Sequence, residues 1–167
     1  DLSSAEQRKI MTNIYEDSNW LLNMVENLLS VTRIQGDSLS INTTEEPVEE
    51  VVAEALEKLK KRYPDAAIQV KIPEEFLMIP MDAVLIEQVT INLLENAIVH
   101  SESILPIEFI VEDHPDDVSF IIRDYGKGLS EEKLQTLFEI GSYNNSQSSD
   151  SRKGMGIGLS ICKTIIT

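Results

Sequence analysis

The 167-residue sequence has a single cysteine, Cys162, and no apolar run near the roughly 20 residues that cross a bilayer. One cysteine excludes an internal disulfide and any cysteine-rich metal site. Residues 1–20 also lack the basic, apolar and small-residue order of a signal peptide. We therefore expect a soluble protein, or a fragment of one, from a reducing compartment, with Cys162 as a small buried hydrophobe.

Basic residues are also scarce. The chain has 14 Lys and Arg against 29 Asp and Glu, which leaves a formal net charge of -15. Such a surface repels the phosphate backbone, and the basic residues form no cluster, so nucleic acid is not an expected partner. A phosphorylated small molecule is still compatible with this charge if a divalent cation, helix N-termini or glycine-loop amides supply positive potential.

Hydrophobic spacing predicts helices and strands that alternate irregularly. Helices are expected from Ser3, where a capping box with Glu6 begins, to Gly36, and at 48–62, 81–100, 130–140 and after the polar loop 140–153. Strands are expected at 39–48, 66–73 and 76–80, and in a hairpin of 106–114 with 117–125. This order predicts an α+β fold, a two-layer α/β sandwich in which helices cover one face of a mixed sheet.

The first helix has an apolar stripe that needs a partner. Ile14, Leu21 and Leu28 recur every seven residues, and Val25 lies on the same face. The sequence has no second helix of similar length before it, and the chain turns at QGDS directly after it. We expect the partner helix to come from outside this chain, which divides the sequence into residues 1–36 and 37–167.

Two glycine-containing segments are candidates for ligand binding. Asp124 follows the strand VSFIIR and opens the stretch DYGKG, in which glycines let a flat ligand approach the backbone. Gly154, Gly156 and Gly158 precede the last helix, whose first amide N–H groups can bind phosphate oxygens. Taken alone, the first segment also fits a tight turn and the second a loop hinge.

The helix at 81–100 places two amides on one face. Asn92 and Asn96 are four residues apart, and His100 follows one turn later. Asparagine oxygens are neutral ligands that suit Mg²⁺, which keeps several waters and binds few protein groups besides substrate phosphates. A single such amide would more simply satisfy backbone groups, but two aligned amides ahead of the glycine segments favour a ligand.

In this order the segments resemble the ATP-binding region of sensor histidine kinases, whose Bergerat-type fold is shared with gyrase, MutL and heat-shock chaperone ATPases. NLLENA with His100 is similar to the N box, DYGKG to the first glycine box, Phe138 to the F box and GMGIGLSIC to the second glycine box. The stretch LLNMVENLLSVTRIQ resembles the second helix of the family's dimerisation hairpin. VENLLSVTRIQ and MDAVLIEQVTINLLENAI most resemble members that sense potassium and turgor.

The resemblance implies a role for each residue. Asp124 would accept a hydrogen bond from the adenine amine, and Gly126 and Gly128 would let the backbone approach the base. Asn96 would coordinate Mg²⁺, with Asn92 on phosphate or metal-bound water. The other residues implied in ATP binding are His100, Leu129, Phe138, Arg152, Lys153, Gly154, Gly156, Gly158 and Leu159. Residues 140–153 would form the lid, which is expected to order when nucleotide binds.

For the whole protein, the resemblance implies transfer of the ATP γ-phosphoryl group to a histidine and then to a response regulator receiver domain. It also implies a homodimer through residues 3–35 and a cytoplasmic location within a membrane-anchored bacterial protein. His100 and His114 do not stand in the family's acceptor motif, so we do not expect this chain alone to autophosphorylate. The family's final strands are expected beyond Thr167.

Two positions depart from the family pattern. Val99 stands where the N box usually has a lysine, and the second aromatic and the basic residue that usually follow Phe138 are absent. These departures leave open a non-catalytic module that has lost nucleotide binding. An ATPase or ATP-gated clamp is also open, although such enzymes commonly have a glutamate general base where Asn92 stands.

Overall fold

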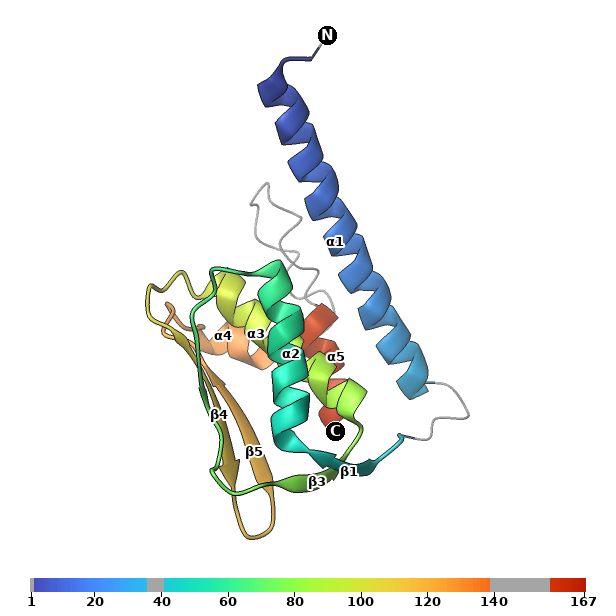
Figure 1. Ribbon diagram of the computed structural model, residues 1–167, viewed down its shortest axis with the longest axis vertical. Coiled ribbons are helices and arrows are strands. Elements are labelled where there is room, and N and C mark those ends of the chain that lie inside the picture. The colour runs from blue at the N-terminus through green and yellow to red at the C-terminus, as the bar shows by residue number, and fades with distance from the viewer. Residues whose placement is uncertain (1, 36–40, 139–156) are drawn as a thin grey trace.

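The computed structural model describes residues 2–35, 41–138 and 157–167, and in it helices cover one face of a small mixed sheet (Figure 1). The elements are α1 Ser4–Gln35, β1 Thr44–Pro47, α2 Val48–Arg62, β2 Ile68–Lys71, β3 Met78–Met81, α3 Ala83–His100, β4 Ile107–Asp113, β5 Val118–Arg123, α4 Glu131–Thr136 and α5 Ile157–Ile166. The predicted α+β class is confirmed. Helix α4 is shorter than the predicted 130–140, and the predicted loop 140–153 lies outside the described residues.

The described strands form two sheets. In the mixed sheet β2 runs parallel to β4, and β4 pairs antiparallel with β5 as the predicted hairpin. Strands β1 and β3 pair antiparallel with each other in a separate ladder. Pro47 in β1 and Pro80 in β3 have no backbone N–H to donate, which restricts both strands to short, peripheral pairing.

The core lies between the mixed sheet and helices α2 and α3. Phe109 of β4 is fully buried, with its ring centroid 6.3 Å from that of Phe120 in β5. Its neighbours in the core cluster are Val48, Val51, Val52, Ala55 and Leu59 of α2, Met81 of β3, Ile91, Leu94 and Ala97 of α3, and Ile107 and Val111 of β4. Burial of these helix faces at helical spacing holds α3 against the sheet.

Ion pairs join α2 and α3 at the edge of the core. The Nζ of Lys58 lies 2.6 Å from a carboxylate oxygen of Glu87, and Arg62 lies 2.5 Å from Glu95. The Arg62 and Glu95 side chains are 23% and 17% exposed, so this pair is more strongly desolvated than an ordinary surface pair. The two contacts fix how α3 lies along α2.

The ends of α3 are set by specific backbone contacts. Asp82 caps the first turn, because its Oδ1 accepts a hydrogen bond from the N–H of Leu85 at 3.2 Å, while its Oδ2 accepts one from the N–H of Asn42. At the other end Glu102 has φ 53°, the left-handed conformation that commonly follows a helix C-terminus. The chain therefore turns sharply after Ser101 and runs back into β4.

Helix α1 lies beside α5, and its first half extends beyond the other elements drawn as ribbons (Figure 1). Its predicted start is confirmed: the N–H of Ser3 donates to Glu6, and the N–H of Glu6 donates to the Ser3 hydroxyl. On its apolar stripe Ile14, Leu21 and Val25 are each more than 50% exposed. Within the described ranges, no helix combines the length and the apolar character that crossing a membrane requires.

Candidate functional site

The first candidate segment is the turn that follows β5. Strand β5 ends at Arg123, so Asp124 is the first residue beyond the sheet, and it is exposed. Its Oδ1 accepts a hydrogen bond from the N–H of Gly126 at 2.8 Å, which folds the turn over its own side chain. Gly128 has φ 68°, where a side chain would be strained, and Leu129 is 44% exposed. The turn presents a carboxylate and bare backbone to solvent.

The same turn is pressed against the end of α3. A Cβ on Gly126 would lie 2.6 Å from the carbonyl oxygen of Ser101 and 2.7 Å from its Cα, so only glycine fits without a shift of backbone. Across the surface, the Nζ of Lys127 lies 3.1 Å from a carboxylate oxygen of Glu102. His100, the last residue of α3, is exposed. The first glycine segment and the end of the asparagine helix are therefore in direct contact.

The two asparagines differ in burial. Asn92 is 7% exposed, whereas Asn96, one turn later, is half-buried. Asn92 faces α5: a Cβ on Gly158 would lie 3.7 Å from its side-chain Cγ, an ordinary packing distance. In this part of the structure Asn92 belongs to the interface between α3 and α5, and Gly158 is the described glycine of the second segment that lies beside it.

Cys162 lies in the same interface and is buried, as predicted. Its thiol donates to the carbonyl oxygen of Val89, with Sγ and O 3.9 Å apart. Burial raises the pKa of the thiol to about 11, although a hydrogen bond with the Asn92 side chain lowers it in part. Cys162 is thus a protonated packing residue, and α5 contacts α3 at Val89 and at Asn92.

The remaining predicted residues fall partly outside the described ranges. Phe138 is 43% exposed, and the Nζ of Lys163 in α5 lies 5.9 Å from its ring centroid, a cation–π distance. Leu159 is half-buried in α5. The predicted residues that lie outside the described ranges are Arg152, Lys153, Gly154 and Gly156.

One buried charge next to the turn was not predicted from the sequence. Glu108 of β4 has a side chain 11% exposed, and its carboxylate accepts hydrogen bonds from Lys71 at 2.6 Å, Tyr125 at 2.8 Å and Arg123 at 3.0 Å. These donors lower its pKa to about 2, and the Lys71 hydrogen bond has the largest effect. The sequence could have indicated this cluster, because Glu108 and Arg123 have opposite charges and face each other in the predicted hairpin.

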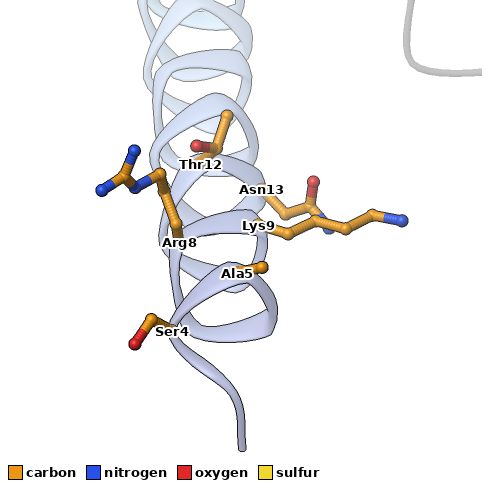
Figure 2. A pocket seen from close by; sticks show the side chains of 6 residues that line it. All are labelled: Ser4, Ala5, Arg8, Lys9, Thr12 and Asn13. Carbon is orange, nitrogen blue, oxygen red and sulfur yellow. The ribbon is translucent and has the colours of Figure 1, made fainter.

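A separate pocket lies at the start of α1 and does not belong to this group (Figure 2). Its lining residues are Ser4, Ala5, Arg8, Lys9, Thr12 and Asn13. All six come from the first turns of one exposed helix, so they cannot enclose a ligand as a binding cleft does. We assign this pocket no role.

Comparison with known proteins gives the family. Residues 81–167 match the family described as histidine kinase-, DNA gyrase B- and HSP90-like ATPase. Sensor protein KdpD of Clostridium acetobutylicum is 42% identical over 165 residues, covering 99% of this chain but 18% of that protein. The chain therefore spans less than a fifth of the length of this curated relative.

Two solved structures share the fold. The catalytic domain of histidine kinase ThkA is 29% identical, with a TM-score of 0.60 over 74% of this chain and 79% of that domain. Full-length ShkA, solved in complex with AMPPNP, is 19% identical, with a TM-score of 0.72 over 99% of this chain and 34% of that protein. The motif-bearing helix, the turn after β5 and the helix α5 all fall within the matched family segment. The chain belongs to the family of histidine kinase-, DNA gyrase B- and HSP90-like ATPases, as the ATP-binding catalytic region of a sensor histidine kinase.

Proposed function

We propose that the chain binds Mg²⁺–ATP between helix α3, the turn that begins at Asp124 and the start of α5. The observation that carries this proposal is the approach to α3 of one described glycine from each segment, Gly126 and Gly158. Gly126 approaches Ser101 at the end of α3, and Gly158 packs against Asn92 in the middle of the same helix. ShkA, which shares the fold, was solved with an ATP analogue, and this also supports a nucleotide ligand.

In this proposal Asp124 accepts the hydrogen bond from the adenine amine. Its exposed carboxylate retains acceptor capacity beyond the contact with the Gly126 N–H. Gly128 and Leu129 would then border the base, and Gly158 and Leu159 at the start of α5 would contact the phosphates. Arg152, Lys153, Gly154 and Gly156, which lie outside the described residues, are proposed as further phosphate contacts. His100 at the end of α3 and Phe138 after α4 are the remaining residues proposed to contact ATP.

Asn96 is the proposed protein ligand for Mg²⁺. It is half-buried on α3, so its amide oxygen is partly open to a metal ion held by the phosphates, and among the described residues no group of three or more His, Cys, Asp or Glu could hold a metal instead. This donor set fits an ion that is held mainly by phosphates and waters. When bound, Mg²⁺ would neutralise charge on the transferred phosphoryl group. Asn92, which is buried against α5, would contact a phosphate or a water molecule bound to the metal ion.

For the full-length protein we propose transfer of the γ-phosphoryl group to a histidine outside this chain, and then to a response regulator receiver domain. The identity to KdpD supports a role in potassium or osmotic sensing, with this region in the cytoplasm of a membrane-anchored protein. The exposed apolar stripe of α1 supports a division into residues 1–36 and 37–167, with homodimer formation through residues 3–35. The chain on its own would bind ATP without autophosphorylating.

Calorimetric titration with AMPPNP, with and without Mg²⁺, tests the site. Asp124→Asn should weaken binding about tenfold or more, because the acceptor of the adenine hydrogen bond loses its negative charge and the amide can turn its NH₂ group towards the adenine amine. Asp116→Asn, in the turn at the opposite end of β5, is the matched control and should bind as the wild type does. Absence of wild-type binding, or equal binding by both variants, would refute the proposed site. Steady ATP hydrolysis by the chain alone would favour the ATP-gated clamp.

A further inference from the structure

Glu108 lies on the face of the mixed sheet that the helices do not cover. Within β4 it alternates with Ile107 and Phe109, which are buried in the core against α2 and α3. A carboxylate on the outer face would ordinarily be solvated, yet this side chain is 11% exposed. Three side chains donate hydrogen bonds to its carboxylate, so Glu108 is the centre of a polar cluster.

The cluster has two kinds of donor. Lys71 of β2 and Arg123 of β5 flank Glu108 on the neighbouring strands, and Arg123 is its register partner. They bind the carboxylate at 2.6 Å and 3.0 Å and tie the three strands together. Tyr125 lies beyond the end of β5, and its hydroxyl reaches back to the carboxylate at 2.8 Å. Of the three donors, only Tyr125 belongs to the turn that carries the proposed adenine contact.

Tyr125 stands directly between Asp124 and Gly126. Tyr125 is 45% exposed, and its hydroxyl is held by the Glu108 carboxylate and by a side-chain hydrogen bond with Arg123. The other side of the turn is restrained by the close approach of Gly126 to Ser101. The turn is therefore held on the helix side by the Gly126 contact and the Lys127–Glu102 ion pair, and on the sheet side by the hydrogen bonds of the Tyr125 hydroxyl.

We infer that Glu108 and Tyr125 are positioning residues for nucleotide binding: the carboxylate on the outer face of the sheet holds the Tyr125 hydroxyl, and thereby sets the place of Asp124. The inference rests on the proposed ATP site. It assigns a binding role to a residue on the face of the sheet opposite to α3. Because three donors keep the pKa of Glu108 at about 2, the carboxylate stays an acceptor throughout the physiological range.

The test measures AMPPNP affinity and thermal stability on the same variants. Tyr125→Phe removes the hydroxyl and keeps the ring, so AMPPNP should bind about three- to tenfold more weakly, as expected for one hydrogen bond, with little change in Tm. Glu108→Ala should show a similar loss of affinity. Glu108→Gln retains an acceptor oxygen for the hydroxyl and should recover most of the affinity.

Lys71→Gln is the matched control, because it removes a donor of the same carboxylate that has no part in the turn. It should lower Tm and leave AMPPNP affinity unchanged. Wild-type affinity in Tyr125→Phe would overturn the inference, and so would an equal loss of affinity in Lys71→Gln, since the cluster would then act only through sheet stability. If the wild-type chain itself fails to bind AMPPNP, the proposed ATP site is refuted first.

Discussion

Replacing Gly126 by alanine would place a methyl carbon 2.6 Å from the carbonyl oxygen of Ser101 and 2.7 Å from its Cα. Both atoms belong to backbone at the end of α3, so neither can move aside as a flexible side chain could. The turn itself offers no room, because the Asp124 Oδ1 lies 2.8 Å from the same position. The substitution must therefore separate the turn from α3.

Alanine substitutions at two other glycines serve as controls, because each would change stability for a different reason. A Cβ on Gly128 meets nothing within 4 Å, but φ 68° is unfavourable for a side chain, so alanine there should cost about 1–2 kcal/mol through backbone strain alone. A Cβ on Gly158 meets Asn92 at ordinary packing distance within helix α5. Alanine there should be neutral or stabilise the chain by up to about 1 kcal/mol, through its better helix propensity.

For Gly126→Ala, overpacking against backbone should cost about 1–3 kcal/mol. In a domain of this size each kcal/mol lowers Tm by about 2–4 °C. Differential scanning calorimetry on the three variants should therefore rank Gly158→Ala highest and the two turn variants below it, and AMPPNP binding should be lost most completely in Gly126→Ala. If Gly126→Ala is as stable as Gly158→Ala and binds AMPPNP normally, the argument from close approach is wrong.

Three further predictions follow from buried or paired side chains. The Glu108 pKa is lowered from 4.5 to about 2, chiefly by its lysine hydrogen bond, so its stabilisation is complete above about pH 4.5 and is lost as the pH falls towards 2. Acid unfolding followed by circular dichroism should thus be shallower over that interval in Glu108→Gln than in the wild type; identical curves would contradict this. Cys162 should resist iodoacetamide at about pH 8 while folded and react readily in guanidinium, because burial raises its pKa to about 11. Mass spectrometry that found rapid labelling of the folded chain would show that the α3–α5 interface opens. Arg62→Met should destabilise the chain by about 1.5–3 kcal/mol in urea titrations, since Glu95 loses a charged partner in a poorly solvated position. Lys61→Met, which removes an exposed pair within α2, should cost about 0.5 kcal/mol or less, and equal effects would contradict the distinction.

Much of the fold could be predicted because local rules determine most of its elements. The apolar spacing of α2 and the proline that follows it predicted the helix 48–62, and the structure has the same bounds. The capping box of Ser3 and Glu6 likewise predicted the start of α1. The division into two sheets could not be predicted, because the parallel pairing of β2 with β4 joins segments almost forty residues apart.

In the candidate site, too, some features could be predicted from the sequence and others could not. The motif residues were recognisable from their order, but the expectation for Gly126 was close approach of a ligand, and its contact with Ser101 of the protein itself was not predicted. Helical spacing placed Asn92 and Asn96 on one face but could not show that α5 covers Asn92. That burial depends on how α5 returns across α3, which no local pattern encodes.

The supports of the Asp124 turn show why a motif does not define a whole binding site. In the motif, Gly126 and Gly128 contribute backbone without a side chain, and Asp124 contributes its carboxylate. The hydrogen bond that the Asp124 carboxylate accepts from Gly126 lies within the turn and does not reach the sheet. The contact with the sheet comes from the Tyr125 hydroxyl and from Glu108, which lies on another strand and faces away from α3. The tyrosine between Asp124 and Gly126 would therefore link nucleotide affinity to charges on the outer face of the sheet. Substitutions on that face should change nucleotide affinity only where they remove a contact of the Tyr125 hydroxyl. Tyr125→Phe should therefore weaken AMPPNP binding, whereas Lys71→Gln should leave it unchanged.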